Sequence, residues 1–199
     1  MLIMKVFITV LVLIFSLQSL TKADDIKEFE IEGMSIGDSL LDYMSEEEIN
    51  NAEQNATKMK EEFLIIWYNS PSLYDDVSIT YRVKDKKYII HSIMAMLYFD
   101  KNIKACEKQK KEIVDEVKNL FTDADFNYRE KVIDQRDKSG KTTFSSFDIN
   151  LKSGAWATVG CTDWSTKMEN ESSMKSIDGL DVTVNSVEYS KFLDNYYYN

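Results

Sequence analysis

Hydrophobic and polar residues alternate with changing periods along the chain, and the period predicts where strands and helices lie. Residues 77–83 alternate apolar and polar side chains, which is typical of a half-exposed strand. Residues 84–87, KDKK, supply a turn, and residues 88–99 return with apolar side chains on both faces. A strand with two apolar faces is usually central and covered on both sides. We therefore expect a β-hairpin whose second strand lies inside the sheet.

A helical period follows the hairpin. Residues 102–121 place Cys106, Ile113 and Val117 on one stripe and lysines and glutamates on the opposite side, which predicts an amphipathic helix with Cys106 facing the core. Glycine-containing turns then separate three predicted strands, and a last strand follows. Their ranges are 128–136, 142–151, 155–162 and 180–184. Cys161 shares the apolar face of the third of these strands with Val159.

The N-terminal part of the mature chain predicts a strand, a turn and two helices. Residues 27–32, KEFEIE, alternate as a half-exposed strand does, and two glycines supply the turn that follows. Asp38 and Ser39 can cap a short helix, and Ser45 with Glu48 has the spacing of a capping box that opens a second helix toward residue 61 or 62.

The remaining segments are less regular. Residues 63–68 fit a strand or a helix, residues 167–179 are polar and loop-like, and residues 190–199 form a tail. Together these elements predict an α+β fold. We expect a largely antiparallel sheet, made of the hairpin, the three-stranded meander and the C-terminal strand, packed against the amphipathic helix.

The first 23 residues have the three-part layout of a secretory signal peptide. Lys5 precedes an apolar run, and small residues at Thr21 and Ala23 fit a signal-peptidase site after Ala23. The alternative is a membrane anchor, but the run of about 15 residues is shorter than the ~20 that span a bilayer. We expect residues 1–23 to be removed and residues 24–199 to form a single soluble domain without stable membrane insertion.

Charge and cysteine content narrow the class of protein further. Loss of Lys5 and Lys22 leaves 22 basic residues against 34 acidic ones, a net charge of −12, which argues against nucleic acid and anionic lipid as partners. Cys106 and Cys161 are the two cysteines of the chain. An exported chain meets oxidising conditions, so we predict a disulfide bond between them, the alternative being two separate buried thiols.

Two serine-hydrolase signatures overlap near the mature N-terminus. The string G-x-S-x-G would make Ser35 a nucleophile, and G-D-S-L resembles the GDSL esterase/lipase family, in which Ser39 would be the catalytic serine. A serine nucleophile needs a base. The one histidine, His91, falls in the middle of a predicted strand, and the G-x-N-D and D-x-x-H strings of that family are absent. We interpret both strings as chance matches within a turn.

Two further patterns suggest ligands without defining a site. Asp123, Asp125, Asn127 and Asp134 fit four positions of an EF-hand calcium loop, but Tyr128 replaces its glycine, so no metal or other cofactor is predicted. Aromatic residues gather late in the chain and either bind a ligand or pack within the fold. They are Trp156, Trp164, Tyr196, Tyr197 and Tyr198.

Several strings together resemble an uncharacterised family of small secreted bacterial proteins. They are IEGMSIGDSLLDY near the mature start, DKKYIIHSI, the helix that holds Cys106, and VGCTD around Cys161. The resemblance implies a periplasmic or secreted location and brings no known activity. We therefore expect no catalytic residues and a protein that binds an envelope protein or a small ligand. The alternative is a serine esterase that uses Ser35 or Ser39.

Overall fold

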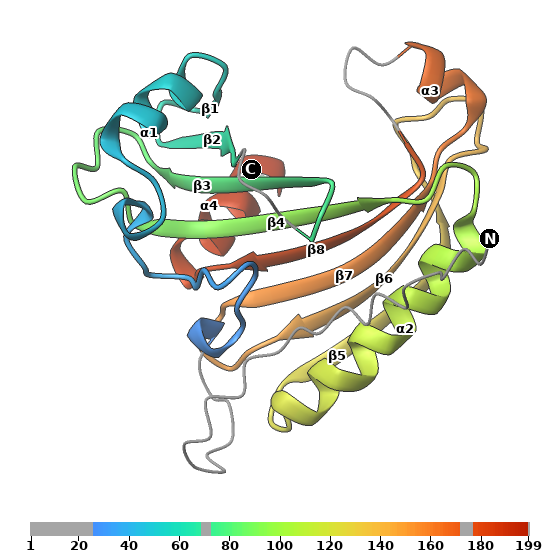
Figure 1. The fold of residues 1–199 in the computed structure, drawn as a ribbon. Helices are drawn as coiled ribbons and strands as arrows, with labels where there is room; N and C mark the ends of the chain where they lie inside the picture. Colours follow the sequence, from blue (N-terminus) through green and yellow to red (C-terminus); the bar gives the residue numbers. More distant parts are fainter. Residues whose placement is uncertain (1–25, 69–72, 172–176, 199) are drawn as a thin grey trace, which may run out of the picture.

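The centre of the molecule is one strongly bent antiparallel sheet (Figure 1). The computed structural model describes residues 26–68, 73–171 and 177–198. Eight strands lie in the order β1-β2-β3-β4-β8-β7-β6-β5. The strands are β1 (Thr57–Met59), β2 (Phe63–Trp67), β3 (Asp76–Arg82), β4 (Ile90–Tyr98), β5 (Asp125–Ile133), β6 (Thr143–Asn150), β7 (Trp156–Asp163) and β8 (Gly179–Asn185). The helices are η1 (Ile26–Glu28), η2 (Leu40–Asp42), α1 (Glu46–Glu53), α2 (Ile103–Leu120), α3 (Thr166–Glu171) and α4 (Val187–Tyr198). The predicted α+β class is confirmed.

Strand β8 joins the hairpin to the meander. The predicted hairpin is β3 and β4, and the predicted meander is β5, β6 and β7. β8 comes last in the chain but lies between β4 and β7, so Val182 pairs with Ala95 on one side and Val159 on the other. This position confirms that β4 is a central strand. It also makes the two halves of the sheet continuous.

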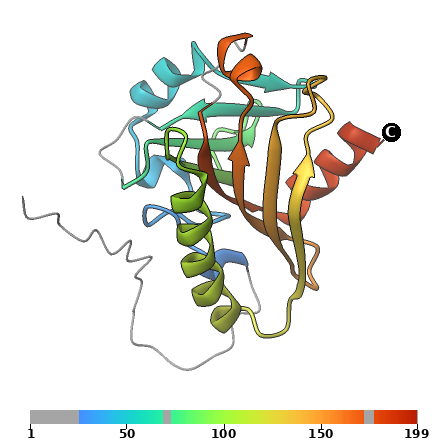
Figure 2. The same ribbon diagram turned by 90° about the vertical axis from the view of Figure 1, so that its right-hand side faces the viewer.

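The two faces of the sheet carry different helices (Figure 2). α2 lies on one face, where it packs on β7 and β8, and α4 lies on the opposite face. The side chains between α2 and the sheet form the main core. Cys106, Ile113 and Val117 of α2 are all buried there, as the helical stripe predicts. The N-terminal segment shares this face, because Phe29 stacks on Phe121 just after α2, with 6.1 Å between ring centroids.

A disulfide bond fastens α2 to the sheet. Cys106 and Cys161 are bonded, with their Cα atoms 6.0 Å apart and a sequence separation of 55 residues. Both side chains are almost fully buried. The predicted disulfide is therefore confirmed, together with the inward orientation of both cysteines.

The N-terminal segment differs from its prediction. Residues 27–32 do not form a strand: they contain η1 and a single bridge between Ile31 and Met34. Phe29 and Ile31 are buried nonetheless, so the apolar pattern indicates packing rather than pairing with a sheet neighbour. Positive φ angles at Gly33 (76°) and Gly37 (94°) confirm the predicted turn.

The next helices begin where their caps predict. Ser39 caps η2 through its side chain, and Ser45 with Glu48 forms the complete capping box of α1. α1 nevertheless ends at Glu53, well before the predicted end, because the chain turns into β1. The ambiguous run 63–68 contains strand β2.

The C-terminal residues form a helix instead of a tail. α4 begins after Ser186, whose Oγ accepts a hydrogen bond from the Tyr189 amide (3.1 Å). Tyr189 and Phe192 then pack against Phe63 of β2, each with a centroid distance of 4.9 Å. These ring contacts stabilise a helix that the weak local pattern did not indicate. The predicted loop 167–179 likewise contains most of α3.

No helix within the described ranges is long and apolar enough to span a membrane. The predicted signal peptide, residues 1–23, lies outside the residues that the structure describes.

We predict that the double substitution Cys106→Ala and Cys161→Ala lowers the free energy of unfolding by up to about 4 kcal/mol. The reason is that the disulfide closes a loop of 55 residues and restricts the unfolded chain. Urea denaturation of the variant and the oxidised wild type measures this difference. Equal midpoints would show that the bond adds no stability to the fold.

Candidate functional site

A cleft of about 500 Å³ lies between the first turns of α2 and the strands β5, β6 and β7. Its lining combines charged, polar and aromatic side chains with the disulfide. The lining residues are Ile103, Lys104, Glu107, Tyr128, Glu130, Lys131, Thr143, Phe144, Ser145, Cys161 and Asp163. Because Cys161 is bonded to Cys106, the disulfide fixes one wall of the cleft relative to the other. The volume suits a small ligand or a few side chains of a larger partner.

A buried lysine lies next to the cleft. Lys110 of α2 is only 2% exposed. Its Nζ is 2.7 Å from Glu107 Oε2 and donates a hydrogen bond to Ser145 Oγ at 2.5 Å. The Ser145 hydroxyl in turn donates to Glu107 Oε1. A buried charge is tolerated only when it is paired and hydrogen-bonded, and this network meets both conditions.

The same network does not activate Ser145 as a nucleophile. A serine–lysine pair needs an amine lone pair to take the serine proton. Here the ammonium group of Lys110 is held by a carboxylate, and the Ser145 proton points to Glu107. The arrangement therefore fixes the shape of the cleft and presents Glu107, whose side chain is 40% exposed, to the cleft.

Two carboxylates of the cleft, those of Glu130 and Asp163, offer contacts to a cationic ligand group. Glu107 also lines the cleft but is paired with Lys110, and Lys104 and Lys131 line it with the opposite charge. Burial raises the pKa of the Asp163 carboxyl, as does the nearby Asp178, whereas Lys131 opposes the shift. A carboxylate that is partly desolvated near a second acid gains from a bound cation.

Tyr128 adds an aromatic surface to the cleft. Its ring already lies 5.3 Å from Lys110 Nζ. Burial raises the pKa of the Tyr128 hydroxyl, and the carboxylates of Glu130 and Glu107 add to the shift. An aromatic face beside carboxylates is a usual environment for an ammonium or guanidinium group.

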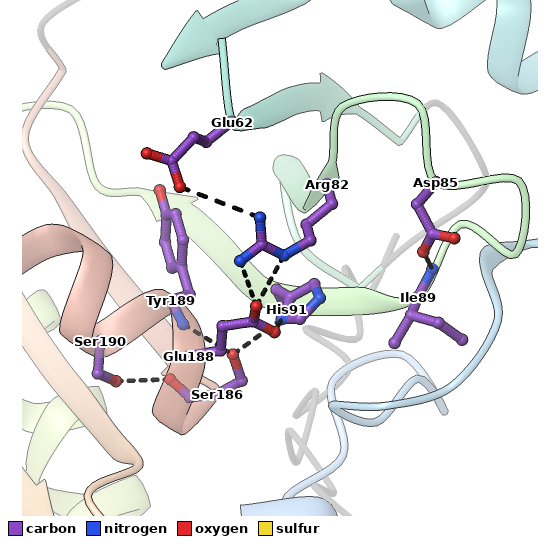
Figure 3. Close-up of polar contacts among 9 residues, drawn as sticks. All are labelled: Glu62, Arg82, Asp85, Ile89, His91, Ser186, Glu188, Tyr189 and Ser190. Carbon is purple, nitrogen blue, oxygen red and sulfur yellow. Dashed lines mark hydrogen bonds and ion pairs between the residues drawn. The ribbon is translucent and has the colours of Figure 1, made fainter. Parts of the chain in front are cut away.

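His91, the histidine considered as a catalytic base, takes part in a second polar cluster on the α4 side of the sheet (Figure 3). His91 Nδ1 lies 3.1 Å from Ser186 Oγ and 3.5 Å from Glu188 Oε2. Arg82 binds the same Glu188 carboxylate, with Nε 2.7 Å from Oε1. The cluster therefore links β3 and β4 to the first turn of α4.

This second cluster is not a catalytic triad. In a triad the serine contacts one ring nitrogen of the histidine and the acid contacts the other. Here Ser186 and Glu188 both lie at Nδ1, and the Ser186 oxygen already caps α4. We interpret these contacts as structural: they hold the first turn of α4 against β3 and β4.

The two candidate nucleophiles lie in the turn that the sequence predicted. Ser35 is buried, and its backbone N–H donates to Asp38 Oδ2 (2.9 Å). Ser39 Oγ donates to the Lys87 carbonyl (2.8 Å) while it caps η2. His91 has its polar contacts with Ser186 and Glu188 instead. The turn does not assemble a serine with a base.

The EF-hand pattern falls on a strand. Asp125 and Asn127 belong to β5, which is extended, and Asp134 binds Arg136 through a 2.5 Å contact. A calcium loop needs its first five ligand positions to wrap around one ion, which an extended strand cannot do. In the described ranges no group of three or more His, Cys, Asp or Glu residues is placed to hold a metal ion.

The late aromatic residues do not form one patch. Trp156 begins β7 and Trp164 follows its end, so about 26 Å of extended chain separates them. Tyr196 and Tyr197 pack edge to face near the end of α4, with 5.0 Å between centroids. Lys60 lies over the Tyr196 ring at 4.8 Å. Tyr198 also belongs to α4.

The sequence did not predict the cleft, because all lysines of α2 were expected on its polar side. Lys110 follows Cys106 by four residues and precedes Ile113 by three, so it lies on the apolar stripe of α2. A lysine on such a stripe is a signal for a buried ion pair. Glu107 and Ser145 gave no comparable signal, because their meeting depends on how α2 lies across the sheet.

No family model, no curated protein and no solved structure matches this chain.

We predict that protonation of His91 destabilises the fold. Burial lowers the pKa of His91, and Arg82 adds to the shift, although Glu188 and Asp85 oppose it. The folded pKa then lies below the unfolded value of 6.5. The stabilising effect of neutral His91 is complete above pH 6.5 and is lost as pH falls through the folded pKa, by at most about 1.4 kcal/mol per pH unit.

Chemical denaturation of wild type and His91→Gln between pH 8 and pH 4.5 measures this effect. Asp181 titrates in the same window with the opposite sign, since burial raises its pKa to about 6. The readout is therefore the difference between the two proteins at each pH. The advantage of wild type over the variant should shrink as pH falls, and a constant difference would contradict the assignment.

Proposed function

We propose that this protein is a soluble, exported, non-catalytic binding protein of the bacterial periplasm or cell exterior, and that the cleft between α2 and β5–β7 binds its ligand. The observation that carries the proposal is the cleft itself, whose walls are joined by a buried disulfide. The buried Lys110 beside it is paired with Glu107. Preorganised walls reduce the entropy lost on binding.

The chemistry of the cleft supports binding rather than turnover. Ser145 donates a hydrogen bond to a carboxylate, Ser35 and Ser39 belong to a turn, and His91 contacts the start of α4. None of these groups has the pairing of nucleophile and base that acyl transfer needs. The carboxylates of Glu130 and Asp163 and the Tyr128 ring favour a small ligand, or a side chain of a partner, that carries an amine.

Two features support the proposed location. The disulfide between Cys106 and Cys161 is a bond that persists in oxidising compartments. The sequence before Asp24 has the layout of a cleavable signal, and strings of the mature chain such as IEGMSIGDSLLDY and VGCTD resemble small secreted bacterial proteins.

The ligand proposal is tested with spermidine as a cationic probe and citrate as an anionic one. Isothermal titration calorimetry should detect spermidine binding and no citrate binding. Glu130→Gln removes one carboxylate from the cleft and should weaken spermidine binding about fivefold, the loss expected for one exposed ion pair.

Glu116→Gln is the matched control, because Glu116 lies on the exposed side of α2 and does not line the cleft. It should bind spermidine as the wild type does. Equal weakening by both variants, or binding of citrate as strong as that of spermidine, would contradict a cationic ligand in this cleft.

Export has its own test. We predict that the protein recovered from the soluble envelope fraction begins at Asp24, because the signal peptide is removed after Ala23. Intact-mass spectrometry of the purified protein reads the N-terminus directly. A mass that retains Met1, or recovery with the membranes alone, would contradict export with cleavage.

A further inference from the structure

Strand β5 forms one edge of the sheet. It pairs with β6 on one side and stands last in the strand order. Within the described ranges no strand pairs with its other side. Nearly all of its side chains are exposed. Such an edge presents unpaired backbone N–H and C=O groups to any strand of matching side chains.

The β5 edge also carries exposed apolar side chains. Phe126 is 39% exposed, Tyr128 is 51% exposed, and Leu120 at the end of the neighbouring α2 is 46% exposed. Phe126 and Tyr128 alternate with Asn127, so they lie on one face, the face that carries α2. Lys110 of α2 lies 5.3 Å from the Tyr128 ring of β5. Apolar side chains along a free edge favour contact with another protein surface.

A β-bulge limits the regular part of the edge. The register with β6 shifts between Arg129 and Val132, and Lys131 has a φ of 43° within the shift. A bulge twists an edge and ends regular pairing. The regular stretch therefore runs from Asp125 to Arg129, with Asn127 at its centre.

We propose that two copies of this chain pair through β5, antiparallel to each other, about a two-fold axis at Asn127. In this register Asp125 lies opposite Arg129 of the second copy, and Phe126 lies opposite Tyr128. The axis repeats both pairs. Opposite charges and aromatic pairs at directly facing positions are the contacts that stabilise antiparallel strands.

The charges select this register over its neighbours. An axis at Tyr128 would place Phe126 opposite Glu130 and Asp125 opposite Lys131 within the bulge, and an axis at Phe126 would place Asp125 opposite the uncharged Asn127. Arg129 is already oriented for a contact on its own face, because it binds Asp148 (2.6 Å) and Ser146 (3.1 Å). A two-fold axis makes the same surface complementary to itself, as closed dimers require.

The dimer would connect with the cleft of the proposed function without depending on it. Tyr128 lines the cleft, so Phe126 of the second copy would border the same opening. A five-residue strand pair buries less than the ~1,200 Å² of standard interfaces, so the dimer should be weak. It should become populated at concentrations of about 10 μM to 1 mM.

Sedimentation velocity of the purified protein over this range tests the dimer. Wild type should shift from monomer to dimer. Asp125→Lys places like charges opposite each other twice and should weaken the association about tenfold. Asp194→Lys makes the same charge change on an exposed position of α4, on the other face of the sheet, and should associate as wild type does.

A cysteine cross-link tests the axis itself. Asn127→Cys brings one introduced thiol opposite its copy, so mild oxidation should give a covalent dimer. Asn150→Cys, one strand inward on the same face, would hold its thiols more than three strand spacings (~14 Å) apart and should stay monomeric. A monomer at every concentration overturns the proposal, as does equal cross-linking of the two variants or a dimer unaffected by Asp125→Lys.

Discussion

The bond between Cys106 and Cys161 is the constraint on which the position of α2 depends. α2 packs mainly on β7 and β8, and it reaches β6 through the polar contacts of Glu107 and Lys110 with Ser145. One covalent link at its first turns therefore sets the distance from the helix to the strands that line the cleft. Burial of Ile113 and Val117 holds the remainder of α2 against the sheet.

The fixed position of α2 explains the polar network beside the disulfide. One turn beyond Cys106, Lys110 is carried into the core and meets Ser145, which is paired across the sheet with Cys161. Removing one member of a buried ion pair is costly because the other charge stays uncompensated. Glu107 supplies that compensation and remains part of the cleft wall, so stability and the proposed binding site share a residue.

Sequence patterns predicted the parts of this fold that are controlled locally. The capping box at Ser45, the hairpin of β3 and β4, and the stripe of α2 each follow from neighbours within a few residues. The disulfide could be predicted because both cysteines lie on apolar faces. The same reasoning failed for residues 27–32, because alternation shows which side chains are buried but not which backbone groups pair.

Other features that depend on distant partners were not predicted. α4 is stabilised by Phe63, which lies more than a hundred residues earlier, and β8 is placed between β4 and β7 by pairing on both of its edges. The cleft combines α2 with three strands, so no single segment contains its pattern. Lys110 was the accessible clue, because its place on the apolar stripe follows from helical spacing alone.

Amide hydrogen exchange, followed by mass spectrometry, tests most directly whether the disulfide holds α2 in place. The oxidised and the gently reduced protein are compared. If the disulfide holds α2 and the cleft in place, reduction should increase exchange in α2 and in β5 to β7. The half of the sheet formed by β2, β3 and β4 should keep its protection. Unchanged protection of α2 after reduction, or an equal increase across the whole sheet, would contradict the account.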